Sequence, residues 1–142
     1  MKKKIDFSEW TPDYESCFFK PSEFFASEIA KDYKINNTPH AWVVIQNLSR
    51  IAYFLDEVRR EFGEDICVSS GYRCDLLNKL VGGANKSYHK CGLAADIYPR
   101  LNSPKKLLKL FSILEQYDLK ECILYNETKH VIHIALPYPY EM

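Results

Sequence analysis

A long amphipathic pattern dominates the first half of the chain and limits the folds that it can adopt. Apolar side chains recur at helical spacing from Thr38 or Pro39 to about Phe62, and Gly63 then provides a stop signal. Shorter helical patterns occupy residues 21–29, 75–80 and 103–116, and segments with β character occupy residues 66–70, 93–98, 121–126 and 131–136. Helices first and interleaved strands later predict an α+β fold with a central antiparallel sheet flanked by helices.

Local signals mark the ends of several elements and the extent of the domain. Ser22 is the predicted cap of the first short helix, and Ser103 followed by Pro104 predicts the start of the last helix. Residues 1–20 are mixed and aromatic, which predicts an irregular arm packed on the domain. The chain has no repeat and no linker, so we expect one domain, residues 1–142, large enough to build a core without disulfide bonds.

Charge and cysteine content exclude several classes of partner. Lys plus Arg and Asp plus Glu each number 19, and this balanced charge argues against binding to nucleic acid or to an anionic membrane.

No apolar run is long enough for a signal peptide or for membrane insertion. The five cysteines are odd in number and form no CxxC pair, so we expect reduced thiols and synthesis in the cytoplasm. We also expect a monomer.

The segment from Ser87 to Asp96 carries the most chemical information. His89 belongs to a predicted polar loop and Asp96 to the strand that follows, and imidazole and carboxylate are both zinc ligands. Gly92 permits a turn between them, and Ala94 leaves room on the face of the strand that carries Asp96. A metal site at the start of this strand is one interpretation of the pattern.

A catalytic metal site needs a third ligand, and His133 in the last predicted strand can supply it. The residues alone leave another interpretation open. A histidine and an aspartate seven positions apart are common by chance, and an imidazole flanked by Val131, Ile132 and Ile134 is often an ordinary histidine of a sheet.

Ordered motifs give the pattern a wider context. They are Ser70-Gly71-Tyr72-Arg73, Leu77-Asn78, Val81-Gly82-Gly83, Ser87-x-His89-x-x-Gly92-x-Ala94-x-Asp96 and the late Val131-Ile132-His133-Ile134. In this order they resemble the peptidase M15 family, and the resemblance extends from about Phe19 to Leu136. The family includes zinc D-alanyl-D-alanine carboxypeptidases and murein endopeptidases of bacteria and phages, endolysins among them.

The resemblance implies a hedgehog/DD-peptidase-like fold with Zn²⁺ held by His89, Asp96 and His133. The metal would act as a Lewis acid on the scissile carbonyl and lower the pKa of its water. The implied reaction is hydrolysis of a peptide bond in peptidoglycan stem peptides or crosslinks. Peptidoglycan peptides are therefore the expected partners.

The resemblance also implies substrate contacts in the Ser-Gly-Tyr-Arg motif and before the first ligand. Arg73 would hold a substrate carbonyl or carboxylate through two parallel hydrogen bonds, with Tyr72 and Ser87 beside it. Taken alone, each residue has a simpler interpretation. Arg73 can form a surface salt bridge, Ser87 can cap a loop and Tyr72 can brace one.

The general base does not stand at the usual position of the family. Members of the family place an Asp or Glu about three residues before the last ligand, where this chain has His130, and Glu127 lies three residues further upstream. Strand alternation puts Val131 rather than His130 on the face of His133. Either residue can accept a proton if a bulge or turn brings it to the site, and either can equally be a plain hairpin residue.

This departure motivates an alternative function. A catalytically weak or inactive zinc-bound module would keep the fold and bind cell-wall peptides or a phage or prophage partner. For an active wall hydrolase without a signal peptide, we expect a route to the wall through phage or prophage lysis or tail machinery.

Overall fold

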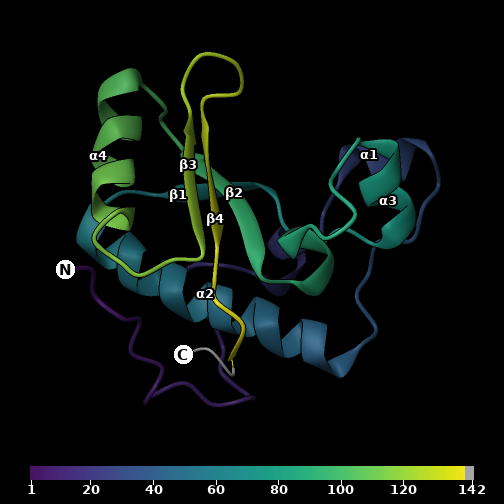
Figure 1. Cartoon of the computed structure of the whole chain (residues 1–142), viewed down its shortest axis with the longest axis horizontal. Helices are drawn as coiled ribbons and strands as arrows, with labels where there is room; N and C mark the ends of the chain where they lie inside the picture. Colours follow the sequence, from purple (N-terminus) through teal and green to yellow (C-terminus); the bar gives the residue numbers. More distant parts are fainter. Residues whose placement is uncertain (140–142) are drawn as a thin grey trace.

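A computed structural model gives the fold, and the structure describes residues 1–139. The helices are η1 (Pro21–Phe24), α1 (Glu28–Asp32), α2 (Trp42–Phe62), α3 (Asp75–Leu80), η2 (Tyr88–Cys91) and α4 (Pro104–Leu114), where η marks a 3-10 helix. The strands are β1 (Ile66–Ser70), β2 (Ala94–Pro99), β3 (Glu121–Tyr125) and β4 (Val131–Ala135). All neighbouring strands are antiparallel, in the order β1-β2-β4-β3 (Figure 1). The predicted α+β class and central antiparallel sheet are confirmed.

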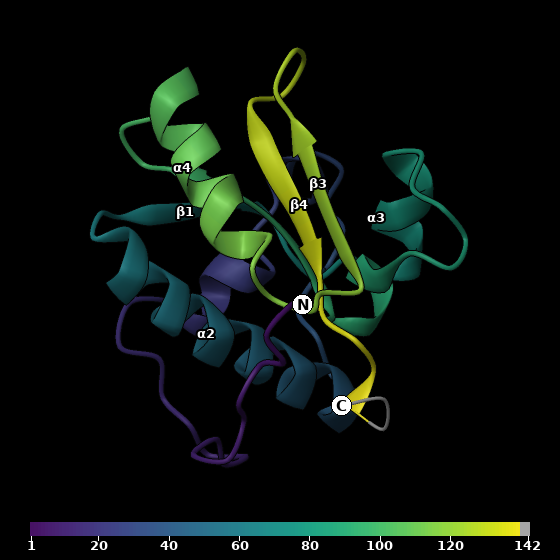
Figure 2. The same ribbon diagram turned by 60° about the vertical axis from the view of Figure 1, so that its left-hand side comes forward.

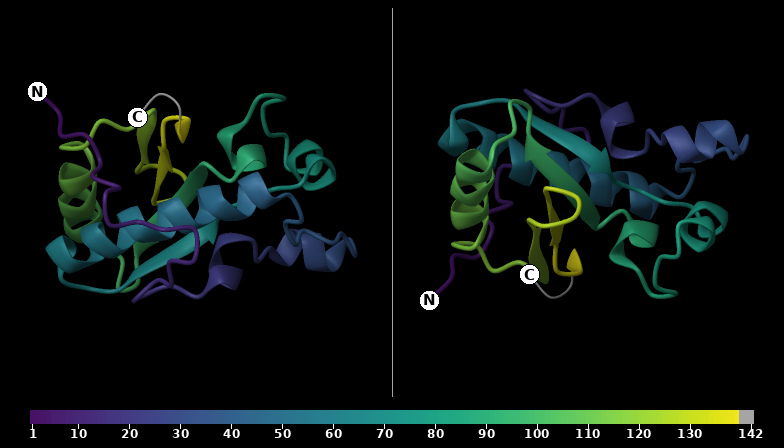
Figure 3. Two further views of the ribbon diagram at one scale, coloured as in Figure 1. Left: turned by 90° about the horizontal axis from the view of Figure 1, so that it is seen from below. Right: turned by 90° about the horizontal axis from the view of Figure 1, so that it is seen from above.

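One face of the sheet forms the core. Ile97 on β2 and Ile132 on β4 are fully buried and share one apolar cluster with Leu55 of α2 and Leu110 of α4. Figure 3 shows α2 running beneath the sheet and α4 along its side. Because side chains alternate along a strand, the neighbours of these isoleucines point to the opposite face, which is free of the two long helices. None of the described helices is long and apolar enough to cross a membrane.

The first predicted helix is in fact two short helices, and its predicted cap is wrong. Glu23 accepts the backbone N–H of Lys20 at 2.7 Å, which closes η1 around Ser22. The next helix, α1, begins after Ser27, whose hydroxyl accepts the N–H of Ala30 at 3.1 Å. Ser27 therefore takes the capping role that the sequence pattern assigned to Ser22.

The long helix begins later than predicted and ends where predicted. Trp42 is its first residue and follows Ala41, which is extended and provides no side-chain cap; upstream, the N–H of Thr38 donates to the side chain of Asn36 at 3.0 Å. At the other end Gly63 adopts the left-handed conformation, φ 82°, and stops the helix. Ser103 caps α4 as predicted, accepting the N–H of Lys106.

The N-terminal arm packs on α2, as its aromatic content predicts. Asp56 of α2 is fully buried and accepts hydrogen bonds from the hydroxyls of Tyr14 and Ser16 and from the backbone of Cys17. Further along α2, the guanidinium of Arg50 lies 4.3 Å from the ring centre of Trp10. These contacts hold residues 10–17 against the helix. All five cysteines are free thiols.

Candidate metal centre

The pairing of β2 with β4 sets Asp96 directly opposite His133. Opposite residues of an antiparallel pair share a face, and here Asp96 Oδ1 lies 2.8 Å from His133 Nδ1. The next pair on this face is Ala94 and Ala135, both small and fully buried. The alanines leave room beside the two polar side chains for a third group to approach.

That third group is His89, which η2 brings to the sheet. The predicted polar loop thus contains a 3-10 turn, and the hydroxyl of Ser87 at its start accepts the backbone N–H of His89 at 3.2 Å. The ring of His89 is 2% exposed, and its Nδ1 lies 2.7 Å from the carbonyl oxygen of Gly71. A carbonyl can only accept, so Nδ1 carries the proton. The lone pair of Nε2 is then free, 3.5 Å from Asp96 Oδ1.

Two glycines allow this approach. A Cβ on Gly71 would lie 2.1 Å from the backbone oxygen of Phe24, so only glycine lets β1 pass η1 at this point. Gly92 ends η2 with φ 75°, and a Cβ there would lie 2.9 Å from the backbone oxygen of Val44. Any larger residue at either position would displace the segments that hold and orient His89.

The spacing of the three side chains fits a metal ion. One ligand atom each of His89, Asp96 and His133 lies within 4.8 Å of the other two. Zinc bonds of about 2.0–2.2 Å in tetrahedral geometry separate ligand atoms by roughly 3.3 Å. The measured separations of 2.8 and 3.5 Å lie on either side of that value. Two imidazoles and one carboxylate also leave a fourth position open, as in catalytic zinc sites.

The electrostatics of the cluster favour an ionised carboxylate. Burial raises the pKa of Asp96, but the neighbouring imidazoles of His133 and His89 outweigh burial and hold this pKa well below its usual range. Burial lowers the pKa of His133, whereas its hydrogen bonds to Asp96 and Glu121 raise it by more. Asp96 is thus deprotonated, which is the state that a metal ligand requires.

Glu121 is a residue of the site that the sequence analysis did not single out. It begins β3, pairs with Ala135 and lies diagonally across from His133 on the same face. Its Oε1 is 2.9 Å from His133 Nε2, and its side chain is 38% exposed. Alternation along 121–125 could have placed Glu121 on one face with Ile123. The register between β3 and β4, which brings Glu121 to His133, cannot be predicted from the local sequence pattern.

Arg73 lies beside the cluster. Its backbone N–H donates to the carbonyl of His89 at 3.1 Å. Burial lowers the pKa of its guanidinium, and the nearby charge of Asp96 raises it in part. Among the described residues its buried Nε has no hydrogen-bond partner. The neighbouring Tyr72 is partly buried against the core, with its backbone N–H donating to Phe24, so it braces the loop.

Two buried asparagines hold the loops of the site. Asn37 donates to the carbonyls of Phe25 and Tyr72 and accepts the N–H of Cys74, so it fixes the backbone on both sides of Arg73. Asn47 of α2 donates to the carbonyl of Cys91 at the end of η2, at 2.9 Å. A polar residue within the apolar stripe of α2 was the available signal for Asn47.

Glu127 and His130 are not brought to the cluster. Both are exposed in the hairpin between β3 and β4, which projects away from η2 (Figure 1 and Figure 2). His130 adopts φ 53°, and its carbonyl accepts a hydrogen bond from Asn102 at 2.9 Å. Among the described residues, neither belongs to the group whose ligand atoms converge.

The face that carries the cluster continues as an exposed strip. Tyr98 lies two residues after Asp96 on β2, and Ile123 pairs with His133. Ile123 is 40% exposed and Tyr125, the next residue of β3 on this face, is 37% exposed. This strip leads directly to the converging ligand atoms.

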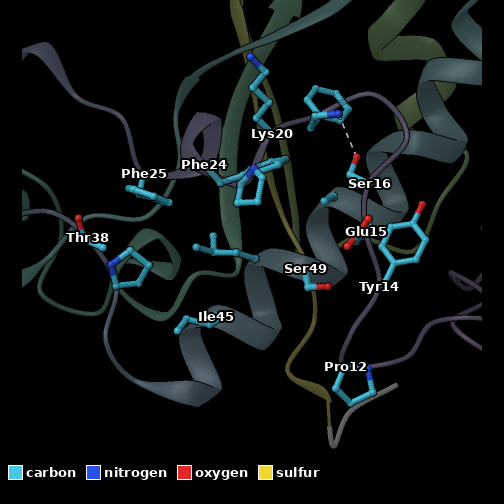
Figure 4. A pocket seen from close by; sticks show the side chains of 15 residues that line it. Pro12, Tyr14, Glu15, Ser16, Lys20, Phe24, Phe25, Thr38, Ile45 and Ser49 are labelled. Carbon is cyan, nitrogen blue, oxygen red and sulfur yellow. Dashed lines mark hydrogen bonds between the residues drawn. The ribbon is translucent and has the colours of Figure 1, made fainter.

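A separate cavity of about 620 Å³ lies between the N-terminal arm, η1 and α2 (Figure 4). Its lining is mostly aromatic and aliphatic, with Tyr14 of the arm, Phe24 of η1 and Ile45 of α2 among the contributing residues. It includes none of the three converging side chains, so the cavity and the cluster are distinct features.

Comparison with known proteins agrees with this geometry. No curated protein matches the chain. A family profile described as Peptidase M15 matches residues 19–135, which include the whole sheet, the three converging side chains and Arg73. The chain therefore belongs to the peptidase M15 family.

Proposed function

We propose that the chain is a zinc-dependent metallopeptidase that hydrolyses a peptide bond of peptidoglycan stem peptides or crosslinks. The observation that carries the proposal is the convergence of His89, Asp96 and His133 within 4.8 Å, in a member of a peptidase family. A zinc ion bound there would polarise the scissile carbonyl and supply a water of lowered pKa. Residues 1–142 would act as one domain.

Each side chain of the site would have its own role in binding the metal, binding the substrate or orienting another residue. His89 offers Nε2 because Gly71 holds the proton on Nδ1, and Asp96 offers an ionised oxygen. Arg73 would hold a substrate carbonyl or carboxylate, and its unpaired buried Nε is a donor that such a group would satisfy. Ser87 would contribute by capping η2 and thereby fixing His89.

The exposed strip beside the cluster suits an extended peptide. Tyr98, Ile123 and Tyr125 offer apolar contact area along one face of the sheet, and Ile123 pairs with His133. A stem peptide lying on this strip would bring one of its peptide bonds to the open metal position. Aromatic side chains provide such contact area with little loss of conformational entropy.

The exposed position of two hairpin residues, Glu127 and His130, favours a second candidate function. Glu127 and His130 are exposed and remote from the converging atoms, so neither is positioned to take a proton there. A zinc-bound module that recognises wall peptides, with little or no hydrolysis, would be consistent with that arrangement.

One experiment separates the two functions. Purified protein is analysed for metal and incubated with purified peptidoglycan, and the soluble fragments are identified by mass spectrometry. The peptidase predicts bound zinc and new peptide termini that are absent with the His89→Ala variant. Zinc-loaded protein that sediments with peptidoglycan and releases no fragment would establish the binding module instead.

A further inference from the structure

The imidazole of His133 lies between two carboxylates. Its Nδ1 is 2.8 Å from Asp96 Oδ1, and its Nε2 is 2.9 Å from Glu121 Oε1. The side chain is 13% exposed, so few waters compete for either nitrogen. Since the two ring nitrogens point in widely different directions, a single metal ion can be bound by only one of them.

The surroundings identify the ligating nitrogen as Nδ1. Asp96 Oδ1, next to His133 Nδ1, is also 3.5 Å from the free Nε2 of His89. On the other side of the ring, Glu121 is not part of the group of converging ligand atoms among the described residues. A metal ion at Nδ1 therefore meets three ligands, whereas one at Nε2 would meet His133 and Glu121 without His89.

We propose that Glu121 is a positioning residue for the metal centre: it accepts the Nε2–H of His133 and so directs the lone pair of Nδ1 toward the metal. The same arrangement exists at His89, where the carbonyl of Gly71 accepts the proton of the nitrogen that does not ligate. Carboxylate partners of this kind fix the tautomer and ring orientation of a metal-binding histidine and raise its basicity.

The fold makes Glu121 suitable for this role. It belongs to β3, whose Cys122 and Leu124 pack against the core, so its backbone is held by both hydrogen bonds and packing. Its pairing with Ala135 sets the diagonal distance to His133. The inference rests on the metal centre of the proposed function and does not depend on peptide hydrolysis.

The test is zinc affinity, measured by competition with a chromophoric chelator for the wild type, Glu121→Ala, Glu121→Gln and the control Glu115→Ala. Glu115 is an exposed carboxylate at the end of α4. Loss of such a partner typically weakens metal binding about 10–100-fold, which we expect for Glu121→Ala. Glu121→Gln keeps an oxygen acceptor and should recover most of the affinity, and Glu115→Ala should match the wild type.

A second measurement reads the tautomer directly. Nitrogen-15 NMR of the zinc-loaded wild type should show the proton of His133 on Nε2 and the metal on Nδ1. Wild-type affinity of Glu121→Ala, with the fold verified by circular dichroism, would overturn the inference. So would a metal on Nε2, which would make Glu121 a direct ligand.

The outcomes also separate this inference from the proposed function. A zinc-loaded wild type that cleaves no peptidoglycan defeats the peptidase but leaves the role of Glu121 testable by affinity. Cleavage by the wild type together with unchanged affinity of Glu121→Ala defeats only the role of Glu121.

Discussion

Two aspartates of this molecule, one buried and one partly buried, have different surroundings. Asp56 on α2 is fully buried and receives hydrogen bonds from four donors of the N-terminal arm, contributed by Tyr14, Ser16, Cys17 and Phe18. Asp96 on β2 keeps 18% of its side chain exposed and faces two imidazoles. The first carboxylate accepts hydrogen bonds only from hydroxyl and backbone N–H groups among the described residues.

The partners of Asp96 are different in kind. The imidazoles of His89 and His133 are groups that can bind a metal, and each has a second acceptor that orients its ring. Three groups of types that can bind a metal lie within 4.8 Å of one another, on the face of the sheet opposite its core. The identity of its partners, more than burial, therefore separates a carboxylate that anchors a segment from one that can bind a metal.

The largest effect is expected from Asp96→Ala. Removal of the central ligand should abolish cleavage of peptidoglycan, because a zinc ion held by two imidazoles alone is neither retained nor oriented. Release of peptides is followed by mass spectrometry. Asp56→Asn, which alters the other buried carboxylate, serves as the comparison and should retain cleavage. Equal loss in both variants would remove the distinction between the two aspartates.

The next effect concerns stability. Asp56→Ala removes the acceptor of several partly buried hydrogen bonds of the arm, and a hydrogen bond to a charged group is worth about 1.5–3 kcal/mol, so the free energy of unfolding should fall by roughly 3 kcal/mol or more. Urea denaturation measures it. Zinc affinity of the folded protein should stay within about twofold of the wild type. A variant as stable as the wild type would show that the arm is not anchored by Asp56.

A smaller effect is expected from Arg73→Lys. A lysine keeps the charge near Asp96 but loses the two parallel hydrogen bonds of a guanidinium. Hydrogen bonds to charged groups are worth about 1.5–3 kcal/mol, so kcat/KM should fall by roughly 10–100-fold. Zinc content should not change. A loss of zinc in this variant would mean that Arg73 supports the metal site and not the substrate.

The smallest effect is expected in the hairpin. Glu127→Ala and His130→Ala change exposed side chains that the structure does not bring to the cluster, so cleavage rates should stay within about twofold of the wild type. Steady-state kinetics of both variants measure this. A fall of a hundredfold or more in either variant would identify it as the general base and would require the hairpin to move toward His133.

Much of the fold follows from local patterns. The apolar stripe of α2, the glycine that ends it and the strand at residues 66–70 are visible in the sequence, since helical periodicity and a left-handed stop residue are local properties. The late start of α2 was not visible, because the helix begins after Ala41 with no side-chain cap to mark it in the sequence. Ser22 and Ser27 were equally good caps by type, and the hydrogen bond from Lys20 to Glu23, which places Ser22 inside η1, decided between them.

The residues of the site also differ in whether the sequence alone reveals them. His89, Asp96 and His133 stand out by residue type and motif order. Glu121 and Asn37 act through partners 12 or more positions away, so only the strand register and the loop contacts show their roles. The positions of Glu127 and His130 depended on how the hairpin turns, which residue type alone does not determine.

The zinc content of the protein tests most directly whether His89, Asp96 and His133 bind zinc. Wild type, His89→Ala, Asp96→Ala and His133→Ala are loaded with zinc, desalted and analysed by elemental mass spectrometry, with folding checked by circular dichroism. We predict one zinc ion per wild-type chain and none retained by any of the three folded variants. Stoichiometric zinc in any one of those variants would contradict the assignment of its missing side chain as a ligand.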